Sequence, residues 1–216
     1  MEKNKLTIMF VMLLVVGLIS TAGGATYAYF AGTTTTNESD MTGKTYELNA
    51  GIKIENRASG KLIPMQDALI SNALASQNIC TDSRGYYACN LFKITLENEG
   101  ISQSFNGFIV TNSGTTLASN DLKYQLYTLS NGTYTAVSDV KAITNGVENY
   151  FTLSNSNITF NLPDGRTSKY STDYYLAVWL SDTNEDQPLV QDKKMDATVK
   201  FVSTLGDQIA ASFTTS

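Results

Sequence analysis

Apolar and polar residues alternate along much of this chain, which is the pattern of β-strands that bury one face and expose the other. From Tyr46 to Glu55, for example, every second residue is apolar. Residues 174–180 (YYLAVWL) are apolar throughout, so they predict a central strand buried on both faces. The other predicted strands show the alternation and comprise residues 46–55, 92–97, 105–111, 122–126, 134–137, 158–162 and 195–201.

Turn-forming residues separate these runs. Asn131-Gly132 predicts a β-hairpin, because both residues tolerate the positive φ angles of a tight turn. Asn145-Gly146 and Pro163-Asp164-Gly165 indicate further turns. Helical spacing is clear only at residues 67–75 (DALISNALA), a short segment that we expect to cap the fold. About nine or ten short strands with so little helix predict an all-β fold, a jelly-roll-type β-sandwich with a short accessory helix.

The start of the chain has the pattern of an export signal. A short charged head precedes an apolar run at residues 6–17, and small residues follow it. Ala28 fits the position before a signal peptidase cut, so we predict cleavage between Ala28 and Tyr29. The alternative is an uncleaved anchor over residues 6–28, which is just long enough to cross a bilayer. Contact with a membrane is expected only before cleavage.

Between the signal and the first strand lies a polar segment without periodicity, which predicts a flexible arm. Tyr29 and Phe30 lead this arm, and the threonines that follow favour an extended backbone. The same segment could equally be a disordered leader. The resulting division is a signal peptide at residues 1–28, an arm at 29–44 and a β-sandwich domain at 45–216. The threonines of the arm are Thr33, Thr34, Thr35 and Thr36.

Composition excludes several classes of function. The chain has no histidine, so neither an H-E-x-x-H zinc site nor a Ser-His-Asp triad can be assembled. We therefore predict that it is not an enzyme and that it needs no cofactor. Its formal net charge of −5 gives no electrostatic reason to bind nucleic acid or anionic lipid.

Two candidate sites come from local spacing. Cys80 and Cys89 are the only cysteines, and in an exported chain such a close pair predicts one intramolecular disulfide. Two free thiols are the alternative, and two cysteines without histidine do not make a zinc cage. Acidic residues from Asp182 to Asp186 resemble the start of a calcium loop, but Gln187 replaces the required glycine, so a solvated loop is the simpler interpretation.

Three short motifs resemble those of TasA- and camelysin-like proteins of Gram-positive bacteria. They are GATYAYF at residues 24–30, PMQD at 64–67, and YLAVWL at 175–180 followed by EDQ at 185–187. The resemblance implies an exported β-sandwich protein, in a family that includes subunits of biofilm-matrix fibres. Some camelysin-like members are described as metallopeptidases, an activity that the absence of histidine puts in doubt here. The middle of the chain departs from the family.

The leading hypothesis is an exported structural protein, a subunit of a biofilm-matrix or cell-surface fibre assembled by strand addition. Its expected partners are copies of itself or related matrix subunits, with signal peptidase acting during export. The expected location is outside the cell, in the matrix or on the surface. The alternative is a monomeric secreted adhesin or carbohydrate-binding module, whose sugar-stacking residues would be exposed tyrosines. These candidates are Tyr86, Tyr87, Tyr127, Tyr134 and Tyr150.

Overall fold

The computed structural model describes residues 49–75, 79–182, 193–204 and 206–215. The predicted cleavage site at Ala28 and Tyr29 and the arm with Phe30 and Thr33 to Thr36 lie outside these residues. So does most of the acidic run that begins at Asp182. No helix in the described part of the chain is long and apolar enough to cross a membrane.

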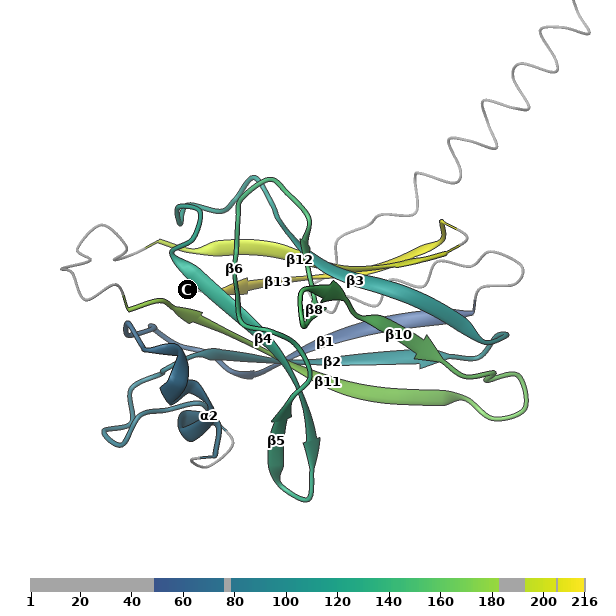
Figure 1. Cartoon of the computed structure of the whole chain (residues 1–216), viewed down its shortest axis with the longest axis horizontal. Helices are drawn as coiled ribbons and strands as arrows, with labels where there is room; N and C mark the ends of the chain where they lie inside the picture. Colours follow the sequence, from purple (N-terminus) through teal and green to yellow (C-terminus); the bar gives the residue numbers. More distant parts are fainter. Residues whose placement is uncertain (1–48, 76–78, 183–192, 205, 216) are drawn as a thin grey trace, which may run out of the picture. The chain divides into compact units, whose positions relative to one another are not determined.

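The described strands form two antiparallel sheets packed face to face (Figure 1). The first sheet has the order β1-β2-β11-β4-β5, with β6 also pairing with β4. Its strands are β1 (Ala50–Ala58), β2 (Asn90–Asn98), β11 (Tyr170–Leu180), β4 (Leu122–Ser130), β5 (Thr133–Ala136) and β6 (Lys141–Ala142).

The second sheet has the order β10-β3-β12-β13, with β7 also pairing with β3. A separate two-stranded hairpin, β8-β9, precedes β10 in the chain. The strands concerned are β10 (Thr159–Leu162), β3 (Gln103–Thr111), β12 (Met195–Ser203), β13 (Gln208–Thr215), β7 (Asn149–Tyr150), β8 (Thr152–Leu153) and β9 (Ser156–Asn157).

The predicted all-β sandwich with one short helix is confirmed, and its connectivity is now defined. The long strands β1, β2, β11 and β4 take the places of A, B, E and D in an immunoglobulin-type Greek key. Strands β3, β12 and β13 take the places of C, F and G, and β10 is added beside β3. The structure thus refines the jelly-roll expectation to a Greek-key sandwich of this order.

Most of the predicted elements lie where the pattern placed them. Helix α2 spans Asp67–Ala75, as predicted. The hairpin from β4 to β5 turns at Asn131 and Gly132, whose φ angles are 51° and 77°. The sequence interpretation missed β13, because Gln208–Thr215 carries small and polar residues with few large apolar ones.

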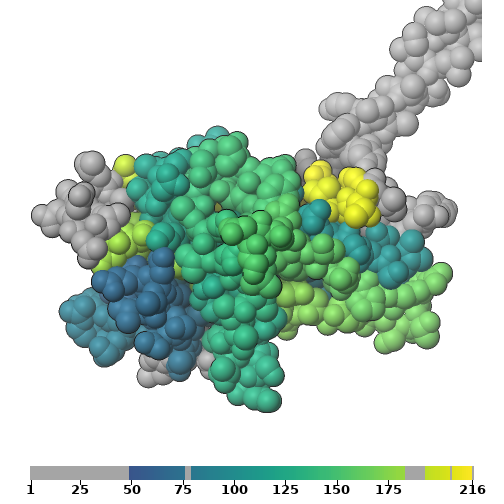
Figure 2. Space-filling model, viewed as in Figure 1, coloured from purple at the N-terminus to yellow at the C-terminus, as the bar shows by residue number. Residues whose placement is uncertain are grey.

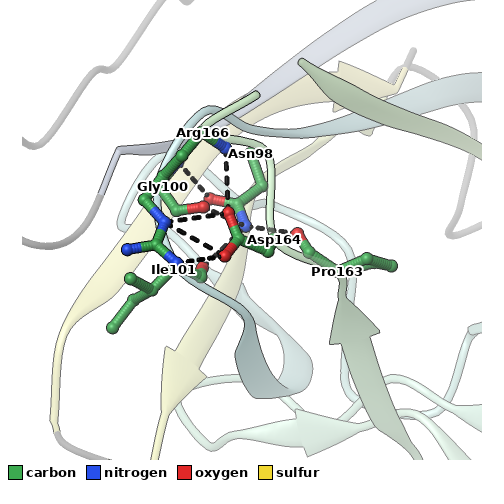
Figure 3. Close-up of polar contacts among 6 residues, drawn as sticks. All are labelled: Asn98, Gly100, Ile101, Pro163, Asp164 and Arg166. Atoms are coloured by element: carbon green, nitrogen blue, oxygen red, sulfur yellow. Dashed lines mark hydrogen bonds and ion pairs between the residues drawn. The ribbon is translucent and has the colours of Figure 1, made fainter. Parts of the chain in front are cut away.

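A buried asparagine holds one corner of the sandwich (Figure 3). Asn98, at the end of β2, is fully buried, and its Nδ2 donates to the carbonyls of Ile101 at 2.8 Å and Pro163 at 2.7 Å. Its Oδ1 accepts the N–H of Gly100 at 3.0 Å. A Cβ at Gly165 would lie 1.8 Å from the Asn98 carbonyl oxygen, so only glycine fits there. One side chain therefore ties the β2–β3 connection to the β10–β11 connection.

Aromatic side chains in the core between the two sheets pack directly against a glycine. Gly107 lies in β3 opposite Phe201 of β12, and aromatic rings occupy the space where a side chain would stand. Phe160 and Phe201 meet edge to face at 4.9 Å between ring centroids. Phe151, Phe160 and Phe201 are all buried. The absence of a side chain at Gly107 is what allows the three rings to pack there.

Replacing Gly107 by alanine is expected to destabilise the fold. The new Cβ would lie 2.7 Å from Phe201, 2.9 Å from Phe151 and 3.0 Å from Phe160. Overpacking of this kind costs about 1–3 kcal/mol of unfolding free energy. Denaturant unfolding of the purified protein measures the change in stability. Gly51→Ala in β1 is the matched control, since nothing lies within 4 Å of that Cβ. Equal stability of the two variants would contradict the packing argument.

Candidate functional site

The first sheet carries a second apolar core on its outer face. In the second half of β11 alternate side chains point away from the sandwich, yet they are buried: Tyr175 is 7% exposed, and Ala177 and Trp179 are 0% exposed. Helix α2 and the loop closed by Cys80 and Cys89 cover them and are referred to below as the cap. In Figure 1 α2 lies on the side of the first sheet that faces away from β12 and β13. The prediction of a strand buried on both faces is confirmed.

One carboxylate joins the cap to the sheet. Asp67, in the first turn of α2, accepts the indole N–H of Trp179 on Oδ1 at 3.0 Å. Its Oδ2 accepts from Nζ of Lys123 in β4 at 2.7 Å. An acidic residue in the first helical turn also interacts favourably with the helix dipole. Asp67 therefore satisfies the one polar atom of a buried tryptophan and begins the helix that covers it.

This junction brings two of the resemblance motifs together. The backbone N–H of Met65, in PMQD, donates to the carbonyl of Leu180, the last residue of YLAVWL, at 3.0 Å. The N–H of Asp182 in turn donates to the Met65 carbonyl at 3.2 Å. The aspartate of the first motif binds the tryptophan of the second. The two motifs are therefore halves of a single structural contact, and the third motif lies outside the described residues.

The expected disulfide between Cys80 and Cys89 is present. Both cysteines are fully buried in the cap core, with their Cα atoms 5.5 Å apart. Closing so short a loop constrains the unfolded chain by about 2–3 kcal/mol in the chain-entropy account. Such bonds persist in oxidising compartments, which is in keeping with an extracellular location.

The tyrosines expected to be free for sugar binding are mostly packing residues. Tyr127 is 3% exposed, and burial raises the pKa of its phenol to about 12. Tyr134 lies edge-on to both Tyr127 and Tyr175, with centroid distances of 6.4 and 5.2 Å. Tyr150 packs on Phe108 at 5.0 Å. The expectation is therefore wrong for Tyr127, because the β4–β5 hairpin curls over the outer face and covers it.

Tyr86 and Tyr87, in the cysteine loop, differ from one another. Tyr87 is half-buried, and its ring fills the space beside Gly60, where a Cβ would lie 2.2 Å from it. Tyr86 is 57% exposed, the largest exposed fraction among the exposed large apolar side chains of the described residues. Among the five tyrosines proposed from the sequence, Tyr86 is the one that presents its ring to solvent. Figure 2 shows the blue atoms of α2 and the cysteine loop at one end of the face in view.

Two long strands form the edges of the sheets on one side of the sandwich. β1 ends the first sheet and β13 ends the second, and the two lie next to each other. On the opposite side the edges are β5 and β10, of four residues each. β1 has three charged side chains, but β13 (QIAASFTT) has neither a charge nor a proline. Charge and proline are the usual protection of an edge, and within the described residues β13 has neither.

The register of β13 shows which backbone groups face outward. The N–H of Ser203 donates to the carbonyl of Asp207 at 2.7 Å, so this pair is hydrogen-bonded. Bonded and non-bonded pairs alternate in an antiparallel ladder. Ile209, Ala211 and Phe213 therefore bond to β12. The residues whose N–H and C=O point away from β12 are Gln208, Ala210, Ser212 and Thr214. Among the described residues no strand pairs with that side.

Neither a metal centre nor a catalytic cluster emerges from the described residues. No group of three or more acidic or cysteine side chains there is arranged to hold a metal ion. Asp139 is typical of the isolated carboxylates. It accepts the backbone N–H groups of Ser154 and Asn155, each at 3.1 Å, and these bonds hold its pKa below the usual value. Its carboxylate closes a turn.

Comparisons with known proteins find distant likeness in solved structures alone. No family model and no curated protein matches the chain. The sporulation control protein Spo0M of Bacillus subtilis aligns at TM-score 0.29 and 6% identity over 77% of this chain and 48% of its own. The CupB6 tip adhesin of Pseudomonas aeruginosa aligns at 0.30 and 12%, over 73% and 42%. The collagen-binding subdomain ACE19 of Enterococcus faecalis surface protein ACE aligns at 0.21 and 7%, over 58% and 85%.

These likenesses are to bacterial proteins, and this chain spans less than half of the first two. At TM-scores of 0.21 to 0.30 they carry no argument about what the chain does.

Removing the carboxylate of Asp67 is expected to loosen the cap. In Asp67→Ala the buried indole N–H of Trp179 would lack its acceptor, a loss that costs about 1–3 kcal/mol. Unfolding followed by the fluorescence of the single tryptophan measures the change. Asp164→Ala is the matched control: it removes an exposed carboxylate that binds the side chain and the backbone N–H of Arg166, and it should cost less because both groups remain accessible to water. An Asp67→Ala variant as stable as the control would contradict this role.

Proposed function

We propose that this chain is an exported structural protein of the TasA- and camelysin-like kind, a subunit of an extracellular matrix or cell-surface fibre. The observation that carries the proposal is the edge of β13, with outward backbone groups and neither a charge nor a proline. The motifs PMQD and YLAVWL support the same proposal, since they form one contact in the cap. Subunits join by strand addition, and the partners are copies of the chain or related matrix proteins.

Strand addition needs an extended segment as well as an edge. The arm at residues 29–44 supplies it: threonines favour an extended backbone, and Tyr29 and Phe30 add apolar area. Each aromatic ring buried in a neighbouring subunit contributes about 1.5–3 kcal/mol. Backbone hydrogen bonds to the outward groups of Ala210 and Ser212 set the register. Cleavage after Ala28 releases the arm, so export precedes assembly.

A test of the acceptor edge uses two neighbouring alanines. Ala210→Pro removes an N–H that points away from β12, a change that an edge strand tolerates, and it should abolish fibres while the subunit stays folded. Ala211→Pro removes an N–H that bonds to β12 and should destabilise the subunit itself. Negative-stain microscopy and circular dichroism of the secreted protein give both readouts. Normal fibres from a folded Ala210→Pro protein would contradict the β13 edge as the acceptor.

A second variant tests whether the arm at residues 29–44 is the strand that is added to a neighbouring subunit. A secreted chain that starts at Thr45 lacks the arm but keeps β13, so it should remain monomeric and accept an added arm peptide. If the shortened chain forms fibres as readily as the longer one, the arm is only a leader. If no version of the protein forms fibres at any concentration, the structural proposal fails, and a monomeric adhesin is the remaining hypothesis.

The proposal gives the chain no enzymatic role. Zinc peptidases of the H-E-x-x-H type and hydrolases with a Ser-His-Asp triad depend on histidine, and the sequence contains none. Purified protein supplemented with zinc is therefore expected to leave casein intact. Hydrolysis that followed the protein through purification and stopped with a chelator would contradict this.

A further inference from the structure

The cysteine loop is a rigid hairpin that ends in an exposed tip. The Ala88 N–H donates to the Cys80 carbonyl at 2.9 Å, and the buried disulfide closes the same end. Tyr87 forms bridges with Thr81 inside the loop and with Leu62 outside it. The base of the loop is therefore fixed by a covalent bond, by backbone pairing and by the cap core.

Asp82 fixes the tip itself. Its Oδ1 accepts the backbone N–H groups of Arg84 and Tyr86, each at 2.9 Å. Gly85 takes a positive φ of 86° and donates its N–H to the Asp82 carbonyl at 3.0 Å. The bond from the Tyr86 N–H is the main cause that lowers the pKa of Asp82 below its usual value. The conformation of the tip is thus set before any ligand arrives.

The tip presents one cation and one aromatic ring. The Arg84 guanidinium carbon lies 5.6 Å from the centroid of the Tyr86 ring, and the Arg84 side chain is 75% exposed. Its Nε donates to Asp82 Oδ2 at 3.2 Å, which orients the guanidinium plane. Tyr86 is 57% exposed. Both side chains are therefore accessible to a ligand.

This pair matches one kind of ligand in particular. A guanidinium group binds a carboxylate through two parallel hydrogen bonds, and a tyrosine ring packs on an apolar surface. A uronic acid offers both on one residue, because its pyranose ring has an apolar C–H face and carries a carboxylate. A carboxylate on a protein side chain offers no such face. The overall charge of −5 repels acidic polymers, so binding must depend on a local site of this sort.

We propose that Arg84 and Tyr86 form a binding site for a uronic acid residue of an acidic polysaccharide. Arg84 pairs with the sugar carboxylate, and Tyr86 supports the ring. The disulfide and Asp82 lower the entropic cost of binding, because they order the tip in the free protein. The site lies on the cap rather than on the edge strands, so it operates whether or not the chain forms fibres.

The experiment measures binding of trigalacturonic acid to the secreted protein by NMR titration, with its methyl ester as the neutral probe. The Ala210→Pro variant serves as the background, which removes fibre formation from the measurement. We expect binding of the acid and at least tenfold weaker binding of the ester. Equal binding of both forms, or no binding of either, would overturn the proposal.

Four substitutions locate the site. Arg84→Ala and Tyr86→Ala should each weaken binding about tenfold. Arg84→Lys should also lose affinity, because an ammonium group lacks the planar fork, while Tyr86→Phe should keep it. Arg166→Ala is the matched control: Arg166 is also exposed and paired with an aspartate two residues earlier, and it should bind as the parent does. Equal loss in Arg166→Ala, or full binding by Arg84→Ala or Arg84→Lys, would contradict a site at the tip. Melting temperatures confirm that each variant is folded.

Discussion

The burial of Trp179 on the outer face of the first sheet is the constraint on which the cap depends. A strand covered on one side only would leave Tyr175, Ala177 and Trp179 in water. The indole also needs an acceptor, since a buried N–H without a partner is costly. Asp67 supplies the acceptor and starts α2, which buries Ile70 and Leu74 against the same face. One nine-residue helix therefore supplies both the hydrogen-bond acceptor and part of the cover over this face.

Helix α2 and the outer face of the first sheet in turn provide the base of the cysteine loop. A loop of this length has too few residues to build a core of its own, so it uses the outer core of the sheet as its base. Its buried disulfide and the half-buried Tyr87 anchor it there. The tip can then extend into solvent without loss of order. The exposed Tyr86 is consequently a product of the same packing that buries Trp179.

The alternation of apolar and polar residues predicted which faces of the strands are buried. It did not predict which side chains from neighbouring strands cover an exposed face. The apolar run at residues 174–180 has no polar side, so its burial on both faces followed directly from the sequence. Tyr127 shows the limit. It sits in an alternating strand that predicts exposure for such a position, but the β4–β5 hairpin places Tyr134 over it. A contact between strands depends on how the sheet curls, and local pattern does not contain that information.

The open edge was the feature hardest to predict, and the reason is physical. Gln208–Thr215 was missed as a strand because Ala210, Ser212 and Thr214 give it little hydrophobic contrast. Those same residues leave its outward side without charge or bulk. An edge is often protected by charged residues, lysine above all, or by proline, and these are visible in a sequence. An unprotected edge has no such signal, so it becomes recognisable only when the strand order shows that no described strand is paired with that side of β13. The weak alternation of apolar and polar residues in β13 and the lack of charge on its outer edge thus have a single cause, which is that the strand consists largely of small and uncharged polar residues.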